Sequence, residues 1–202
     1  HLTSSRTFYR NGSRPILQKL VRRVLKGEKD SFRIVECLAG YVCSAVPWAG
    51  YYEKVTSKRL PSDSGASEED IIASGFGWCN EQARVFCALT QIAGMASRLV
   101  FGENVQKTYG HVSAEVLTPG GWMAVDPSFG LCFQMKGRPV RAIDICGVKS
   151  VYARFEPIYG ERCHLLCAEV GEKILKRSFA MAVAPNPLDG FARVAIHNHF
   201  IH

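Results

Sequence analysis

The chain has 202 residues, of which 47% are apolar and 21% are charged, and its formal net charge is +7. This length predicts one large domain, or one domain with an extension, that buries a core without disulfide or metal support. The sequence contains neither an apolar run of the ~18 residues that a membrane span needs nor the pattern of a signal peptide.

Basic residues gather near the start of the chain, but their setting is that of a solvated helix face. Arg22 and Arg23 lie between apolar residues, and no aromatic residues alternate with the basic ones as a stacking platform for bases requires. We therefore expect no nucleic-acid partner. The minority interpretation is a basic nucleic-acid binder, which predicts binding that falls steeply with added salt. The basic residues of this region are Arg6, Arg10, Arg14, Lys19, Arg22, Arg23 and Lys26.

The cysteines are typical of a protein in a reducing, cytoplasmic compartment. We also expect no cofactor. They lie in apolar, periodic surroundings, which is typical of reduced, buried thiols. No Cys-x-x-Cys pair is present, and Cys163-His164-x-x-Cys167, the nearest pattern to a zinc site, is interpreted as packed residues. The alternating His197, His199 and His202 are interpreted as a frayed end, so we expect no metal. The cysteines are Cys37, Cys43, Cys79, Cys87, Cys132, Cys146, Cys163 and Cys167.

The first third of the chain predicts helices. Residues 1–14 are expected to form a loose arm, and residues 15–202 a single domain. Pro15 opens a helix with apolar residues on one face, and Gly27 ends it. A second helix starts near Asp30 or Ser31 and stops at Pro47.

A loop and a short helix lead to the most informative cysteine. Residues 56–66 predict a loop, and the capping-box pattern of residues 67–70 predicts a short helix after it. Gly75 and Gly77 break that helix and lead to a longer one over about residues 79–93.

Beyond Gly94 the apolar period changes from 3.6 to 2, which predicts strands. The first two strands are expected at 96–101 and 112–116, and a turn at 118–121 leads to a third at 122–126. Helices followed by strands favour an α+β architecture with an antiparallel sheet. The C-terminal part, 131–202, is expected to be a β-rich extension with strand-like runs at 131–135, 148–155, 165–170, 179–183 and 191–196.

Three residues of this region can together supply nucleophilic catalysis. Cys79 lies in the first turn of a helix, where the helix dipole lowers the pKa of a thiol and the N–H of Cys79 can donate to an oxyanion. His111 begins a strand and is the only histidine between positions 1 and 164, and Asp126 ends the next strand. A thiol, an imidazole and a carboxylate can act as nucleophile, base and orienting group.

The spacing of the hairpin predicts that His111 and Asp126 share a face of the sheet. If Pro119 and Gly120 are its two loop residues, Ser113 lies opposite Asp126, and alternate residues project to the same side. We expect the helix of Cys79 to pack on that face. The other face is apolar and suits a core: Val112, Ala114, Val116, Met123 and Val125.

Each of these residues has an ordinary interpretation when it is taken alone. Cys79 suits a buried helix thiol, His111 a strand-start residue that bonds a loop, and Asp126 a turn opener before Pro127. Their joint occurrence, with the right strand parity, favours catalysis.

The chain resembles the transglutaminase-like superfamily of papain-related fold over roughly residues 30–130. The motifs that carry the resemblance are Gly77-Trp78-Cys79-Asn80-Glu81-x-Ala83-x-x-Phe86-x-x-Leu89, His111-x-x-x-Glu115-Val116 and Gly121-Trp122-x-x-Val125-Asp126-Pro127. The segment around Cys79 is also similar to that of peptide N-glycanases, although the zinc-binding Cys-x-x-Cys pairs of those enzymes are missing. Residues 126–130 are faintly similar to arylamine acetyltransferases, whose Arg-rich lead into the cysteine is absent.

The resemblance implies a fold, a site and a reaction. N-terminal helices, one bearing the nucleophile, would pack on an antiparallel sheet, with Cys79 as nucleophile, His111 as base and Asp126 as orienting group. It also implies a second oxyanion donor, for which Trp48 is the candidate, although Trp48 also suits a core position. Trp78 and Trp122 are expected to wall a substrate groove.

The implied function is cysteine-dependent acyl transfer through a thioester. The substrate would be a peptide, a protein or a small amide or ester, and either water or an amine would accept the acyl group. The alternative is a catalytically silent transglutaminase-like domain used for binding or scaffolding. Arg98 is expected to form a structural ion pair, and Glu81 to complement the helix dipole.

Overall fold

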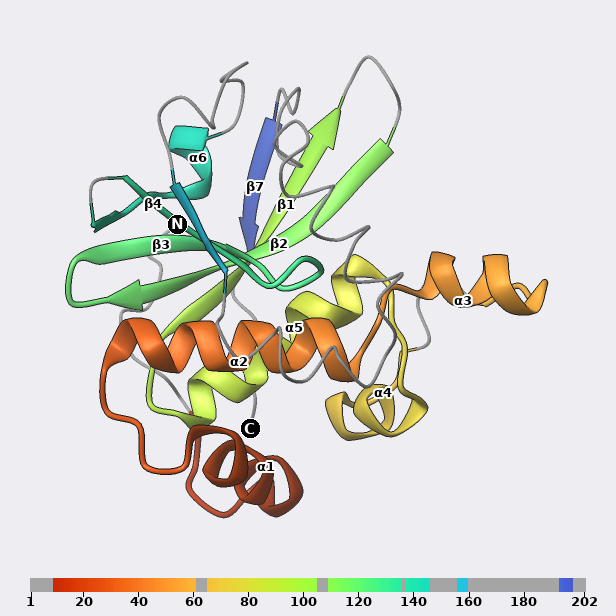
Figure 1. Ribbon diagram of the computed structural model, residues 1–202, viewed down its shortest axis with the longest axis horizontal. Helices are drawn as coiled ribbons and strands as arrows, with labels where there is room; N and C mark the ends of the chain where they lie inside the picture. The colour runs from red at the N-terminus through yellow and green to blue at the C-terminus, as the bar shows by residue number, and fades with distance from the viewer. Residues whose placement is uncertain are drawn as a thin grey trace.

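The computed structural model describes residues 9–60, 65–104, 109–135, 137–145, 156–159 and 193–197. Helices come first along the chain and the strands follow, so the architecture is α+β, as predicted (Figure 1). The helices are α1 (Pro15–Leu25), α2 (Ser31–Ala45), α3 (Ala49–Thr56), α4 (Glu68–Ser74), α5 (Cys79–Ile92) and α6 (Ala142–Ile145).

The ends of the predicted helices follow local chemistry. Pro15 occupies the first turn of α1, and Lys26 and Gly27 end this helix with positive φ angles. The side chain of Asp30 caps α2 by accepting a hydrogen bond of 2.9 Å from the N–H of Arg33. Ser67 caps α4 in the same way, through the N–H of Asp70 at 3.2 Å. These side chains bond N–H groups that have no partner within the helix.

Helix α3 was not predicted. It begins two residues after Pro47 and contains Gly50 and two tyrosines, which are weak helix formers, so its sequence carries little helical signal. The loop that was expected over residues 56–66 begins one residue later, because Ser57 ends α3 in the left-handed conformation.

The strands form one antiparallel sheet in the order β5-β4-β3-β2-β1-β7, with β6 paired to β4. The predicted strand 131–135 coincides with β4, and the predicted strand 191–196 overlaps β7. The runs expected at 148–155, 165–170 and 179–183 lie outside the described residues. The strands are β1 (Ser97–Asn104), β2 (Tyr109–Thr118), β3 (Gly121–Asp126), β4 (Leu131–Met135), β5 (Arg138–Pro139), β6 (Glu156–Tyr159) and β7 (Arg193–His197).

The register of the β2–β3 hairpin is the predicted one. Thr118 pairs with Gly121 across the two-residue turn, and the ladder continues to the pair of Ala114 and Val125. In this register Ser113 is opposite Asp126, so His111 and Asp126 project from the same face.

The helices α1, α2 and α5 lie on one side of the sheet (Figure 1). The face that was predicted to be apolar is buried there, and its residues join those of the helices in one cluster. On the other face α6 lies against β3, and the carboxylate of Glu115 in β2 accepts a hydrogen bond of 2.6 Å from the N–H of Ala142. The strand residues of the helix-facing core are Leu99, Val112, Ala114, Val116, Met123, Val125 and Cys132.

The expectation that the Cys79 helix packs on the face of His111 and Asp126 is therefore wrong. The buried stripe of α5, which includes Ala83, Phe86 and Leu89, is apolar and packs on the apolar face. Burial of apolar surface decides which face the helix covers. Cys79 meets His111 at the end of the helix, not across its side.

Candidate active site

The segment before Cys79 is held against the chain at Trp48. The N–H of Gly77 donates to the carbonyl of Pro47 at 3.0 Å, and the N–H of Ala49 donates to the carbonyl of Gly77 at 2.8 Å. A Cβ at Gly77 would lie 3.0 Å from Val46 Cγ1 and 3.2 Å from the Cβ of Glu81. Glycine therefore permits the close approach that places Trp78 and Cys79 at the start of α5.

A carboxylate stabilises the start of α5. The N–H of Trp78, the residue before the helix, donates to Glu81 Oε2 at 2.9 Å, and Glu81 is buried. The negative charge of Glu81 lies in the first turn, where it complements the helix dipole. Helix geometry leaves the N–H of Cys79 without a partner inside the helix.

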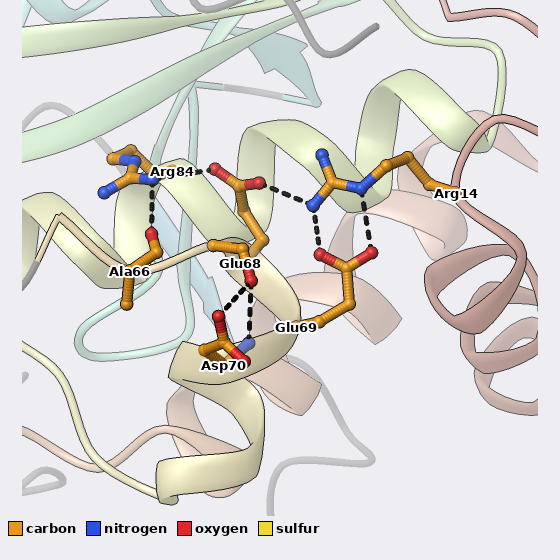
Figure 2. Close-up of polar contacts among 7 residues, drawn as sticks. Arg14, Ala66, Glu68, Glu69, Asp70 and Arg84 are labelled. Atoms are coloured by element: carbon orange, nitrogen blue, oxygen red, sulfur yellow. Dashed lines mark hydrogen bonds and ion pairs between the residues drawn. The ribbon is translucent and has the colours of Figure 1, made fainter.

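A cluster of charged residues ties α4 to α5 and to the start of α1 (Figure 2). Glu68 is buried and bridges two guanidinium groups, that of Arg14 at 2.8 Å and that of Arg84 in α5 at 3.1 Å. Arg84 also donates to the carbonyl of Ala66 at 2.8 Å, and Arg14 pairs with Glu69. This cluster fixes the helix that precedes the Cys79 segment against the helix that Cys79 begins.

His111 and Asp126 are in direct contact. Nε2 of His111 lies 2.8 Å from Oδ2 of Asp126, whose side chain is fully buried. The other carboxylate oxygen, Oδ1, accepts a hydrogen bond of 3.1 Å from the N–H of Ser128. Both oxygens of the carboxylate are thus engaged, which fixes the orientation of the imidazole ring.

The sulfur of Cys79 lies at the start of β2. It forms a hydrogen bond with the imidazole of His111 and accepts another from the N–H of Val112. The pairing of β2 with β3 extends from the turn only as far as Ala114. His111 and Val112 lie beyond that pair, so no β3 residue is paired with them. The first turn of α5 reaches β2 there, although the rest of the helix covers the opposite face. Because Nε2 bonds Asp126, Nδ1 is the ring nitrogen that faces the sulfur.

The electrostatics of the site favour a thiolate beside an imidazolium. Burial raises the pKa of the Cys79 thiol, but the hydrogen bond and charge of His111 and the N–H of Val112 together lower this pKa below its ordinary value. Burial lowers the pKa of His111, but the charge and hydrogen bond of Asp126, followed by those of Cys79, raise it to about 10. An opposite charge at hydrogen-bonding distance stabilises the charged form of each group.

The three tryptophans lie at different distances from this cluster. Trp48 is 53% exposed, and its ring packs edge-on against Trp78, with a centroid separation of 5.9 Å. Trp122 pairs with Leu117 and lies four residues before Asp126, or about 13 Å along the strand. Its ring lies under the guanidinium of Arg98 at 3.9 Å. The structure thus places Trp48 and Trp78 beside Cys79 and Trp122 away from it.

Arg98 forms the predicted structural ion pair. Its Nε donates to Glu115 Oε2 at 2.7 Å, and both side chains are buried. This pair lies on the face of His111 but farther along the strands, so it supports the sheet.

Sequence reasoning missed Gln82 and Ser128. Gln82 is fully buried in α5, and its Oε1 accepts a hydrogen bond of 2.6 Å from Ser128 Oγ. Its Nε2 donates to the carbonyl of Val46 at 2.7 Å. Gln82 lies one turn before the apolar residues Val85 and Phe86, and a polar side chain at such a position is the signal that could have revealed it.

The described part of the chain contains no group of three or more His, Cys, Asp or Glu side chains that could hold a metal ion. The Cys163-His164-x-x-Cys167 pattern, His199 and His202 lie outside the described residues. None of the described cysteines forms a disulfide: Cys37, Cys43, Cys79, Cys87 and Cys132. In the same ranges, every helix is too short or too polar to cross a membrane.

The chain is similar in part to solved structures of other proteins. A search of curated proteins found no match. Similar solved structures include a candidate cysteine protease from Cytophaga hutchinsonii, with 19% identity and a TM-score of 0.46 over 55% of this chain. A candidate protease from Parabacteroides distasonis has 9% identity and a TM-score of 0.44 over 56%. A structure described as a TGase has 15% identity and a TM-score of 0.40 over 60%.

The matched regions span only 36%, 23% and 34% of those three structures. The profile of the transglutaminase-like superfamily matches residues 18–127, more than half of this chain, and this range includes Cys79, His111 and Asp126. The chain therefore belongs to the transglutaminase-like superfamily.

Proposed function

We propose that this protein is a cysteine-dependent acyl-transfer enzyme that acts on an amide or ester through a thioester on Cys79. The observation that carries the proposal is the hydrogen-bonded line from the Cys79 thiol through His111 to the buried carboxylate of Asp126. Thiolate character is what makes a cysteine nucleophilic, and this line supplies it.

The first half of the reaction forms the acyl-enzyme. The thiolate of Cys79 attacks the substrate carbonyl carbon, and the carbonyl electrons move onto its oxygen. When the tetrahedral intermediate collapses, the bond from carbon to the leaving amine or alcohol breaks. The imidazolium of His111 donates its proton to that leaving group, and a thioester remains.

The second half releases the acyl group. His111, now neutral, removes a proton from water or from an amine, which attacks the thioester carbonyl. The C–S bond breaks, and the thiolate and the imidazolium are restored together with an acid or a new amide. We favour water as the acceptor, because water is always present at the site.

Donors to the oxyanion come from the start of α5 and its neighbours. The N–H of Cys79 is one donor, since helix geometry leaves it without a helical partner. The indole N–H of Trp48 is the second, because the segment that carries Trp48 is bonded directly to Gly77. Trp78 packs against Trp48 and forms one wall of the substrate site. The substrate is a peptide, a protein or a small amide or ester.

The test is to trap the acyl-enzyme. The protein is incubated with a panel of peptide amides and activated esters and quenched in acid, and its intact mass is measured. We expect an adduct of the acyl mass, located on Cys79 by peptide mapping and lost in Cys79→Ala. Cys87→Ala, which removes the buried thiol in the middle of the same helix, is the matched control and should keep the adduct. Adducts spread equally over the cysteines would contradict the proposal and favour a binding or scaffolding domain.

A further inference from the structure

A buried chain of hydrogen bonds links the nucleophile helix to the carboxylate of the site. Gln82 lies one helical turn after Cys79, with 0% exposure, and its Oε1 accepts a hydrogen bond of 2.6 Å from Ser128 Oγ. The N–H of the same serine donates to Asp126 Oδ1 at 3.1 Å, and Asp126 Oδ2 bonds His111. One glutamine therefore connects the helix of the thiol with the turn that orients the carboxylate.

The other end of the Gln82 amide is anchored to a third element. Its Nε2 donates to the carbonyl of Val46, the residue that ends α2, at 2.7 Å. The carbonyl of Ser128 in turn accepts from the thiol of Cys43 in α2, with a sulfur–oxygen distance of 3.6 Å. Both ends of the amide are satisfied, so Gln82 has one orientation, and the turn after β3 is held against α2 and α5.

We propose that Gln82, acting through Ser128, is a positioning residue that sets the orientation of Asp126 and hence the charge state of the Cys79–His111 pair. This inference rests on the proposed function. Asp126 raises the pKa of His111, and the protonated ring lowers that of Cys79, so the effect depends on the distance and direction of the carboxylate. Loosening the turn at Ser128 weakens the contact between carboxylate and ring, and the thiol then keeps its proton to higher pH.

The experiment measures the rate of alkylation of Cys79 by iodoacetamide from pH 5 to pH 10, with peptide mapping to isolate the signal of that cysteine. Gln82→Met keeps the length of the side chain and removes both hydrogen bonds. Gln91→Met is the matched control, because Gln91 is a buried glutamine at the other end of α5 that bonds Ser97 Oγ at 3.5 Å. Circular dichroism establishes that each variant is folded.

We expect Gln82→Met to raise the pH of half-maximal alkylation by about half a unit, which lowers the rate at pH 6 about threefold. Gln91→Met should reduce thermal stability but keep the wild-type pH profile. The pair Ser128→Ala and Ser128→Thr decides the question even if Gln82→Met does not fold. Ser128→Ala, which removes the hydroxyl, should move the pH profile in the same direction as Gln82→Met. Ser128→Thr, which retains the hydroxyl, should keep the wild-type profile.

Two results would overturn the inference in different ways. A wild-type profile in folded Gln82→Met, or equal profiles for the two Ser128 variants, would show that Gln82 only packs the interior. If Cys79 of the wild-type protein reacts at pH 6 no faster than cysteine in solution, the proposed function fails, and the positioning role fails with it.

Discussion

Two thiols of one helix show how strongly position determines chemistry. Cys79 lies in the first turn of α5, beside an imidazole and a backbone N–H, and its pKa is lowered. Cys87 lies in the middle of the same helix with no exposure, and burial raises its pKa to about 12. The same side chain is therefore shifted towards the thiolate at one point and held as a neutral core thiol at the other.

The largest expected effect comes from removing the imidazole. His111→Ala deprives Cys79 of the hydrogen bond and the positive charge that lower its pKa, and burial then raises it, as it does for Cys87. We expect alkylation of Cys79 at pH 6 to fall about 100-fold, the effect of two pKa units. Mass spectrometry of the alkylated peptide measures the rate. In urea the variant and the wild type should react equally, and an unchanged rate in the folded variant would refute the pairing.

A smaller effect is expected from removing the charge behind the imidazole. In the wild type, the thiolate–imidazolium pair forms as Cys79 loses its proton below the ordinary thiol pKa, and it disappears as His111 loses its proton near pH 10. Asp126→Asn lowers the pKa of His111 and so raises that of Cys79. Both changes narrow the pH range in which the thiolate–imidazolium pair exists. We expect about a tenfold slower alkylation at pH 6.

Direct repulsion between Asp126 and the thiolate acts in the opposite direction, since its removal favours the thiolate. It is the weakest of the influences on the Cys79 pKa, so the loss of the imidazolium should dominate. The pH profile of alkylation in Asp126→Asn separates the two effects. A shift of its acidic limb to lower pH would show that repulsion is the stronger influence.

The smallest effect on the alkylation of Cys79 is expected from removing the thiol of Cys87. Cys87→Ala removes a buried sulfur atom, and we expect the free energy of unfolding to fall by about 1 kcal/mol because a small cavity remains. The rate of Cys79 alkylation should not change. Urea unfolding monitored by circular dichroism gives the first quantity, and the iodoacetamide assay gives the second. A lower rate of Cys79 alkylation in this variant would mean that packing in the middle of α5 affects the reactivity of the thiol in its first turn.

The residues of the candidate site could be predicted from local rules. A helix start marks Cys79, and a two-residue turn places His111 and Asp126 on one face whatever surrounds them. Such features depend on neighbours along the chain. The same rules could have shown that Trp122 lies about 13 Å from Asp126 along the strand.

What could not be predicted depends on packing between distant segments. The apolar face that α5 covers was already evident in the sequence, but the contact of the first turn of α5 with His111 depends on where the β2–β3 ladder ends. Gln82 carries no local signal of its partners, since Val46 and Ser128 are far from it in the sequence. Helix α3 is short and forms at a proline-containing junction, where helix propensity is uninformative.

The pairing of β1 with β7 has a consequence for synthesis of the protein. Phe101 of β1 pairs with Ala195 of β7. The strand that pairs with this edge of β1 is therefore translated long after the helices and β1 have left the ribosome. At roughly 5–20 residues per second, the interval lasts several seconds. During that time the nascent chain presents an unpaired strand edge, which is the kind of surface that chaperones shield and that neighbouring chains can join.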